Sequence, residues 1–412
     1  MPIKKVCHNL WLSFVSLLLT YLIFEFVVFR FCLHYLPLKI HKMLNPPVRV
    51  LAQSSKRNTL PKDYIAILGD SYAAGKGDWL LQVNSYINPP FASQHLIYQK
   101  TGTDVISFGG PSYGSIQGLI TTPFIYIRYI NKIFPFHLDY PQKVLIYFYE
   151  GNELIDNLGD VNYMVSRGIK LEEIMEPLSF RKKILGAIIP ADPYYRSAHE
   201  FLWSDQFIFA PFVFRLCLHL LPSQRNRENN QQNSTGPIDI QNEILLDGKK
   251  IIIPNRLQSP TLALTQEEMN KGFYIFEQSA RFLSEKFSQS QIFLVYVPSP
   301  LACYQIVSSE VSIDRRHQQI LANRSEFYDA SLVTTTSDEI ASNIKKICQK
   351  LQIRFVDTRP SLREEAKKYL IHGPQDWFHF NERGYRVLAD TIVPYLNPST
   401  APDSAAAKSL KS

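Results

Sequence analysis

Five short apolar runs recur along the chain, and each is followed by glycine, proline or polar residues. The runs are residues 64–68, 104–108, 143–149, 291–298 and 353–357. Runs of this length without polar alternation are typical of strands buried on both faces of a parallel sheet. Apolar residues at helical spacing predict helices over 269–287, 337–351 and 385–393. The alternation predicts an α/β fold, with a mainly parallel sheet between two layers of helices.

Two acidic residues predict where the helix over 337–351 begins. Asp338 and Glu339 carry the negative charge that favours the N-terminus of a helix. We therefore expect this helix to begin just before them.

The longest apolar stretch lies at the N-terminus. Between residues 7 and 29, only His8 and Glu25 can carry a charge near neutral pH. About 20 mostly apolar residues are enough to cross a bilayer, and no small-residue cleavage site follows. Residues 1–37 are therefore predicted to form one uncleaved transmembrane anchor.

The basic residues around this anchor give conflicting signals for its orientation. Lys4 and Lys5 favour an N-terminus inside the cell, whereas Arg30 and the basic residues at 39, 42 and 49 favour the opposite. Charge alone leaves the side of the membrane open.

The remaining chain divides by composition. Residues 38–62, with prolines at 46, 47 and 61, are expected to form a tether, and 63–396 one catalytic domain. The strand and helix pattern blurs over 154–269, which indicates an insertion. Within it, 201–221 is strongly apolar but interrupted by Asp205, Pro211 and Arg215, so an inserted cap, an interfacial segment and a buried helix all remain open. Residues 397–412 are expected to be a disordered tail.

Composition narrows the function classes. The chain has 412 residues, 45% of them hydrophobic, which is ordinary for a globular protein. Its net charge of +7 comes from scattered Lys and Arg, and the aromatic residues fall in apolar runs. This pattern disfavours nucleic-acid binding and fits a surface near an anionic membrane or an acidic polymer. The five cysteines form no metal-spaced pair, and no cofactor or metal is expected.

The first run ends in Gly69-Asp70-Ser71. Open α/β sheets bind ligands at the carboxyl ends of their strands, so a serine at this point is well placed to be a nucleophile. The alternative is an ordinary turn or a helix cap.

Two further strand ends carry hydrogen-bond donors. Gly109 follows the second run, where a residue without Cβ lets a backbone N–H approach a ligand. Asn152 follows the third run and could donate from its side-chain amide. A simple turn is the alternative at both positions.

Asp376 and His379 lie near the C-terminus. Their three-residue offset lets the carboxylate hold the imidazole in the tautomer that accepts a proton. A capping pair is the alternative.

Taken in order, these four motifs resemble those of the SGNH (GDSL-type) hydrolase family, whose flavodoxin-like α/β/α fold we then expect. The resemblance implies that Ser71 is the nucleophile, His379 its general base and Asp376 the residue that orients His379. It also implies an oxyanion hole formed by the N–H groups of Ser71 and Gly109 and by the Asn152 amide. Tyr72 replaces the leucine of the family motif, Ser107 stands where many members have asparagine, and Gly151 directly precedes Asn152.

Residues 69–77, 109–117 and 298–300 look most like membrane-tethered members found near bacterial polysaccharide O-acetylation systems. This implies an extracytoplasmic domain and an ester of a carbohydrate, or a similar acylated small molecule, as substrate. Three functions remain open: an esterase, an O-acyltransferase with the same site and a membrane acyl-donor partner, and a non-catalytic carbohydrate-binding module.

Overall fold

A sheet of five parallel strands lies at the centre of the computed structural model, which describes residues 3–36, 38–41, 43–77, 92–185, 207–220, 241–315 and 324–396. In spatial order the strands are β10 (Arg354–Asp357), β6 (Gln291–Val297), β3 (Lys143–Tyr149), β1 (Tyr64–Gly69) and β2 (Asp104–Ser107). Because β1 lies between β2 and β3, the chain winds outward in both directions from the middle, which is the flavodoxin-like order. The predicted parallel sheet is confirmed, and each predicted run forms one strand.

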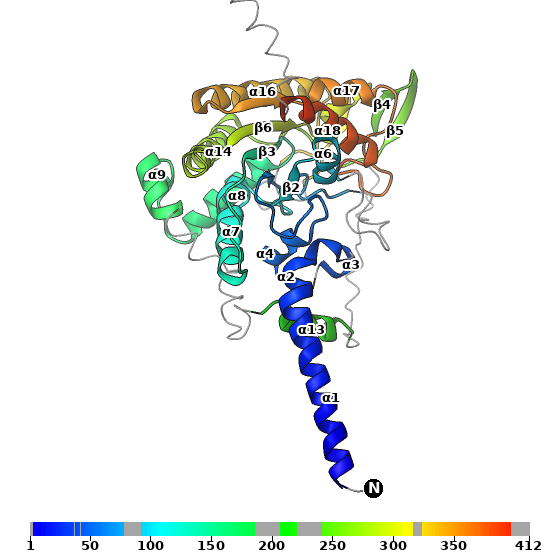
Figure 1. Ribbon diagram of the computed structural model, residues 1–412. Coiled ribbons are helices and arrows are strands. Elements are labelled where there is room, and N and C mark those ends of the chain that lie inside the picture. Colours follow the sequence, from blue (N-terminus) through cyan, green and yellow to red (C-terminus); the bar gives the residue numbers. More distant parts are fainter. Residues whose placement is uncertain are drawn as a thin grey trace, which may run out of the picture.

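Helices cover both faces of this sheet (Figure 1). In one layer α18 (Glu382–Leu396) packs on α6 (Ser93–Thr101) and α17 (Arg359–Ala366). In the other layer α14 (Gln266–Lys286) packs on α8 (Glu153–Ser166), on α16 (Ser331–Leu351) and on the π-helical η4 (Ile116–Thr121), which leads into α7 (Thr122–Ile133). The predicted three-layer arrangement is therefore confirmed.

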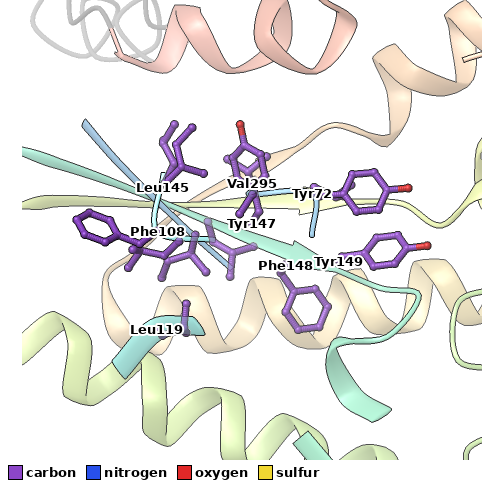
Figure 2. Packing of buried hydrophobic residues seen from close by; sticks show 14 of the residues in the cluster. Tyr72, Phe108, Leu119, Leu145, Tyr147, Phe148, Tyr149 and Val295 are labelled. Carbon is purple, nitrogen blue, oxygen red and sulfur yellow. The ribbon is translucent and has the colours of Figure 1, made fainter. Parts of the chain in front are cut away.

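Strand β3 shows why the strands have uninterrupted apolar sequences. Leu145 points to one side of the sheet and Phe148 to the other (Figure 2). Both side chains are fully buried, and the Phe148 ring lies 5.1 Å from the ring of Phe276 on α14. A strand between two helical layers needs apolar residues at consecutive positions.

Two long helices begin earlier than their apolar spacing predicts. Thr265 and Glu268 form a capping box that starts α14 at Gln266, with the Thr265 N–H donating to Glu268 Oε2 at 2.7 Å. Helix α16 starts at Ser331, whose N–H donates to Asp329 Oδ1 at 2.8 Å. Asp338 and Glu339 therefore lie about two turns inside α16. The prediction that they mark its N-terminus is wrong.

The expected tether packs against the domain along much of its length. It contains α3 (Leu38–His41), α4 (Pro46–Arg49) and the 3-10 helix η3 (Val50–Ala52), and α4 packs on α7. Leu44, Val48 and Leu51 are buried in the core. This part of the expected tether is therefore folded onto the domain.

The same segment also protects the outer strand of the sheet. The Ser107 N–H of β2 donates to Gln53 Oε1, and the Val105 N–H donates to the Ser55 carbonyl, both at 2.8 Å. These contacts occupy backbone groups that an edge strand otherwise leaves open.

The predicted insertion begins inside α8 and contains α9 (Leu171–Ile174), α10 (Pro177–Ser179) and the π-helical η5 (Phe180–Leu185). It continues into an antiparallel sheet of β4 (Asn242–Leu246), β5 (Lys249–Ile253) and β7 (Gln305–Ile306), the last of which follows α15 (Pro300–Cys303). Strands β8 (Glu310–Ser312) and β9 (Phe327–Asp329) form another antiparallel pair. Hydrophobic periodicity did not predict any of these short strands.

An apolar helix projects from the domain at the N-terminus (Figure 1). Helix α1 (Ile3–Ile23) continues through the π-helical η1 (Phe24–Val28) into α2 (Phe29–Phe31), and η2 (Leu33–Tyr35) follows. The stretch Val6–Phe31 has a mean hydropathy of 2.2 and is long enough to cross a bilayer.

Helix α13 (Phe209–Leu220) lies beside this projecting helix (Figure 1). Its side chains at 213, 214 and 218 are exposed, so the alternative of a buried helix is wrong for this part of 201–221. The predicted tail at 397–412 lies outside the described residues.

Candidate active site

The turn after β1 places Ser71 at the carboxyl end of the sheet. Gly69 has φ +135°, and a Cβ there would lie 2.6 Å from the Tyr147 carbonyl oxygen of β3. Glycine is therefore needed for the strand to turn so close to its neighbour. The carboxylate of Asp70 then accepts the Tyr72 N–H at 2.9 Å, which closes the turn around Ser71.

The loop before α18 places His379 against this turn. Asn381 caps the helix, because its Oδ1 accepts the N–H groups of Arg383 at 3.0 Å and Gly384 at 3.2 Å. Two residues earlier, His379 Nε2 lies 2.8 Å from Ser71 Oγ. The two residues are 308 positions apart in the chain, and the fold brings them into direct hydrogen-bond contact.

Asp376 holds the other side of the same imidazole. Its Oδ2 lies 2.6 Å from His379 Nδ1, and its Oδ1 accepts the Phe378 N–H at 2.9 Å. Burial alone would raise the pKa of Asp376, but the hydrogen bonds from His379 and Phe378 outweigh it and hold that pKa below its usual value. Since a carboxylate can only accept, Nδ1 carries the proton and Nε2 is free to accept from the Ser71 hydroxyl.

Asn152 lies at the carboxyl end of β3, where α8 begins. It occupies the N-cap position, yet its side chain makes no capping hydrogen bond. The amide instead lies near the Asp70 carboxyl and lowers its pKa, and Asn152 Oδ1 has no hydrogen-bond partner among the described residues although Asn152 is only 3% exposed. A capping role therefore does not explain this asparagine.

Gly109 packs directly against the nucleophile turn. A Cβ at this position would lie 2.5 Å from the Cβ of Ala73 and from the N of Ala74. Its N–H donates to Ser107 Oγ at 3.2 Å, and the Ser107 hydroxyl in turn donates to the Ala73 carbonyl at 2.5 Å. The Gly109 N–H, which is expected in the oxyanion hole, therefore already makes a long hydrogen bond to Ser107 within the protein.

Asp70 is a second carboxylate beside the nucleophile. Its Oδ2 lies 3.5 Å from Ser71 Oγ, and the side chain is fully buried. Burial raises the pKa of Asp70 to about 6, although hydrogen bonds from Tyr72 and Asn152 and the nearby His379 work in the opposite direction.

Two tyrosine hydroxyls join the nucleophile turn to the C-terminal part of the site. Tyr72 donates to the Phe378 carbonyl at 2.7 Å, and Tyr385 of α18 donates to the Lys76 carbonyl. Both tyrosines are fully buried. Figure 2 shows Tyr72 beside Tyr149 of β3, and their ring centroids lie 4.4 Å apart. Sequence reasoning missed these roles, because an aromatic residue next to an apolar run indicates only core packing.

Glu150 supports the strand end that carries Asn152. The side chain is fully buried and accepts four hydrogen bonds. Its Oε1 accepts from the N–H and the hydroxyl of Ser299, at 2.9 and 2.8 Å, and its Oε2 accepts from Tyr296 at 2.5 Å and from Ser337 at 2.7 Å. These bonds tie the ends of β3 and β6 to α16. No motif in the sequence signals this network.

A hollow opens next to this strand end. It is lined by Gly151, Ile155, Gln258, Ser259, Thr261, Ala263, Ile313 and Asp314. The Tyr149 hydroxyl donates to Gln258 Oε1 at 2.5 Å, so the wall of this hollow is tied to the same strand.

No protein-family model matches the chain, and no curated protein matches its sequence. Among solved structures, it is similar to an extracellular lipase from Streptomyces rimosus, with a TM-score of 0.34 and 12% identity over 82% of this chain and 100% of the lipase. It is also similar to an acetyl xylan esterase, Est2A, from Butyrivibrio proteoclasticus (TM-score 0.32, 12% identity, 82% of this chain and 63% of the esterase). A phospholipase A1 from Streptomyces albidoflavus NA297 gives a TM-score of 0.34 and 11% identity over 82% of this chain and 99% of the phospholipase. Similarity this low carries no functional conclusion, so the function has to be inferred from the residues of the site.

Proposed function

We propose that this chain is a serine-dependent hydrolase of carboxylic esters. The observation that carries the proposal is the unbroken hydrogen-bond chain from Asp376 Oδ2 to His379 Nδ1, at 2.6 Å, and from His379 Nε2 to Ser71 Oγ, at 2.8 Å. A serine hydroxyl is a weak nucleophile unless an adjacent base removes its proton, and that base must be held in one tautomer. Ser71 supplies the hydroxyl, His379 the adjacent base, and Asp376 the carboxylate that holds this base in one tautomer.

In the first half of the reaction, Ser71 Oγ bonds to the ester carbonyl carbon while its proton moves to His379 Nε2. The Asp376 carboxylate stabilises the resulting imidazolium, since its lowered pKa keeps it ionised. His379 then gives the proton to the leaving alcohol oxygen as the carbon–oxygen bond breaks, which leaves an acyl group on Ser71. In the second half, His379 takes a proton from water while the water oxygen bonds to the acyl carbon. The bond between that carbon and Ser71 Oγ then breaks, His379 returns its proton to Ser71 Oγ, and the acid is released.

The negative oxygen formed in each half needs preorganised donors. The proposed donors are the N–H groups of Ser71 and Gly109 and the side-chain amide of Asn152. The Gly109 N–H already faces Ser107 Oγ, and the Asn152 amide already faces Asp70. Both groups would have to donate to the oxyanion as well.

We further propose that the substrate is an acetyl or other acyl ester of a carbohydrate, and that α1 anchors the enzyme with its domain outside the cytoplasm. The substrate and the orientation depend on the resemblance of residues 69–77, 109–117 and 298–300 to membrane-tethered polysaccharide-modifying proteins. The anchor is supported by the length and hydropathy of Val6–Phe31. Protease access to the domain in intact cells tests the orientation.

The test of the chemistry uses the full chain in detergent or nanodiscs. A fluorophosphonate probe should label Ser71, and a chromogenic acetyl ester should be hydrolysed. Ser71→Ala should abolish both, whereas Ser166→Ala, at an exposed serine of α8, should abolish neither. With an oligosaccharide acceptor present, acetylated sugar formed at the expense of hydrolysis would identify an acyltransferase. Failure of the probe and of every ester to react with Ser71 would overturn the proposal and favour a non-catalytic binding module.

A further inference from the structure

Helix α13 is apolar on the face that it exposes. Its described exposed side chains are Ala210, Val213, Phe214, Cys217 and Leu218. These positions follow the spacing i, i+3, i+4, i+7 and i+8, which places them on one stripe of the helix. A helix facing water normally carries polar residues on that stripe, and here every one of the five is apolar.

The opposite face of α13 is apolar as well and packs on the N-terminal helix. The ring of Phe209 lies 5.0 Å from that of Phe24 and 5.3 Å from that of Phe29, and the ring of Phe212 lies 5.0 Å from that of Phe29. Between these two faces lies Arg215, which donates to the Met43 carbonyl at 3.4 Å. A helix with two apolar faces belongs in a protein core or in a membrane. The exposed stripe excludes the first of these for α13.

Glu25 fixes the start of α13 to the projecting helix. Its two carboxylate oxygens accept the N–H groups of Ile208 and Phe209, each at 2.8 Å. The side chain is fully buried and also pairs with Arg30 at 3.3 Å, and Arg30 donates to the Ile133 carbonyl at the end of α7. A carboxylate inside an otherwise apolar span is costly unless it is paired, and these bonds explain why this one is tolerated.

The contacts also set the depth of α13. Phe29 and Phe24 lie two and seven residues before Phe31, where the apolar span ends. At about 1.5 Å per residue, α13 would lie about 3 to 10 Å below that end of the span. Helices that lie in the membrane surface bury their apolar face to a similar depth, about 5 to 10 Å. With 12 residues, α13 is about 18 Å long and too short to cross the bilayer.

Other exposed rings surround the same end of the span. Phe31 is 50% exposed and Phe136, in the loop after α7, is 60% exposed, and their centroids lie 6.3 Å apart. Together with the stripe of α13, they continue the apolar surface of the projecting helix onto the base of the domain.

From this arrangement we infer that α13 lies in the interface of the bilayer that α1 crosses, with its exposed stripe in the lipid. The occupant of this face is therefore phospholipid. A second copy of the chain is the less suitable occupant, because the stripe is continuous with a span that itself requires lipid. The inference depends on the proposed membrane anchor, but not on the proposed reaction. Its effect is to seat the domain on the membrane at two points and so to limit its rotation about α1.

The test places a fluorescent probe on Cys217, a natural cysteine of the stripe, in the full chain in phosphatidylcholine nanodiscs. Cys7→Ser and Cys32→Ser leave Cys217 as the accessible thiol, because Cys303 and Cys348 are buried. Two control proteins also carry Cys217→Ser. One has Leu17→Cys in the middle of the span, and the other has Thr334→Cys on the exposed side of α16.

We expect the Cys217 probe to be quenched by a lipid nitroxide near the headgroup, and its quenching by aqueous iodide to be about fivefold weaker than that of the Thr334→Cys probe. Iodide quenching equal to that of the Thr334→Cys probe would overturn the inference. Protection from both quenchers would also overturn it, since protein would then cover the stripe. If iodide reaches the Leu17→Cys probe, the anchor itself fails. If Leu17→Cys is protected by lipid and Cys217 is not, only the placement of α13 is wrong.

A second variant tests the attachment. Glu25→Ala removes the acceptors of the Ile208 and Phe209 N–H groups and should increase iodide quenching at Cys217 about twofold or more, while the Leu17→Cys probe stays protected. No change at Cys217 would contradict the proposed role of Glu25.

Discussion

The hydroxyl of Tyr72 donates a 2.7 Å hydrogen bond to the carbonyl of Phe378, across 306 positions of sequence. Tyr72 directly follows the proposed nucleophile, and Phe378 directly precedes the proposed base. The bond therefore joins the two loops whose separation sets the distance between Ser71 Oγ and His379 Nε2. A leucine at position 72 could pack in the same place but could not make this bond.

Tyr72→Phe should lower kcat about tenfold and leave KM nearly unchanged, because the His379 loop loses its fixed distance to Ser71. The ring contacts with Tyr149 and Phe380 remain, so the free energy of unfolding should fall by only about 1 kcal/mol. Ester hydrolysis and urea unfolding in detergent measure the two effects. Tyr163→Phe, at an exposed tyrosine of α8, is the control. An unchanged kcat in Tyr72→Phe would contradict the positioning role.

Asn152→Ala should raise the barrier to ester hydrolysis by about 3 kcal/mol, a loss of about a hundredfold or more in kcat, because one oxyanion donor is removed. Stability should change by less than about 1 kcal/mol, since the side chain does not cap α8. Asn157→Ala is the matched control. That side chain accepts from the Ser115 N–H and donates to the Gly272 carbonyl, so its loss should reduce stability more than kcat. Equal kcat losses in both variants would contradict the proposal that Asn152 donates to the oxyanion.

Glu150→Gln should destabilise the protein by about 3 kcal/mol. Gln has one acceptor oxygen, and its amide group would face donors that now point at a carboxylate. Ser337→Ala removes one of the four bonds and should cost about 1 kcal/mol. Thermal unfolding of the wild type and the two variants measures both losses of stability. Similar losses in both would mean that the four bonds do not depend on the charge of Glu150.

Asp70 should make stability depend on pH. Its pKa is about 6 in the folded protein and 3.8 as the ordinary value, so the folded state keeps a proton that the unfolded state has already released. The contribution of Asp70 to the free energy of unfolding is therefore fully present below about pH 4, falls as the pH rises towards 6 and is lost above it. The total change is about 3 kcal/mol. Asp70→Asn should remove this slope, so that the variant gains relative to the wild type between pH 4 and pH 7. Urea unfolding across this range checks the sign, and Ser71→Ala, which removes no titratable group, should keep the slope.

The sheet could be predicted from the sequence because its strands are buried on both faces. Val144 to Tyr149 of β3 are each at most 1% exposed, and such burial selects consecutive apolar residues. The hairpin of β4 and β5 was missed, because its strands are short and half-exposed. Its turn did carry a signal: Asp247 and Gly248 both have positive φ, which is the reason Asp-Gly is frequent in two-residue hairpins.

The residues predicted for the catalytic site each lie at the end of a run that predicts a strand, or near the start of the last helix. Ser71, His379 and Asp376 were found in this way, and the structure brings them together. The supporting residues Tyr72, Tyr385 and Glu150 could not be found, because their hydroxyls and carboxylate act across more than a hundred positions of sequence. Such contacts leave no local spacing to detect.

The way in which Gln53 and Ser55 cover β2 has a practical consequence for producing the domain without the apolar N-terminal helix. A shortened chain that begins at Leu60 would lose both residues, together with the buried Leu44, Val48 and Leu51. The bare strand could then recruit a strand from another molecule, and insoluble material would be the expected product. A cut ahead of Leu38 keeps this cover in place and is the better starting point for a shortened chain.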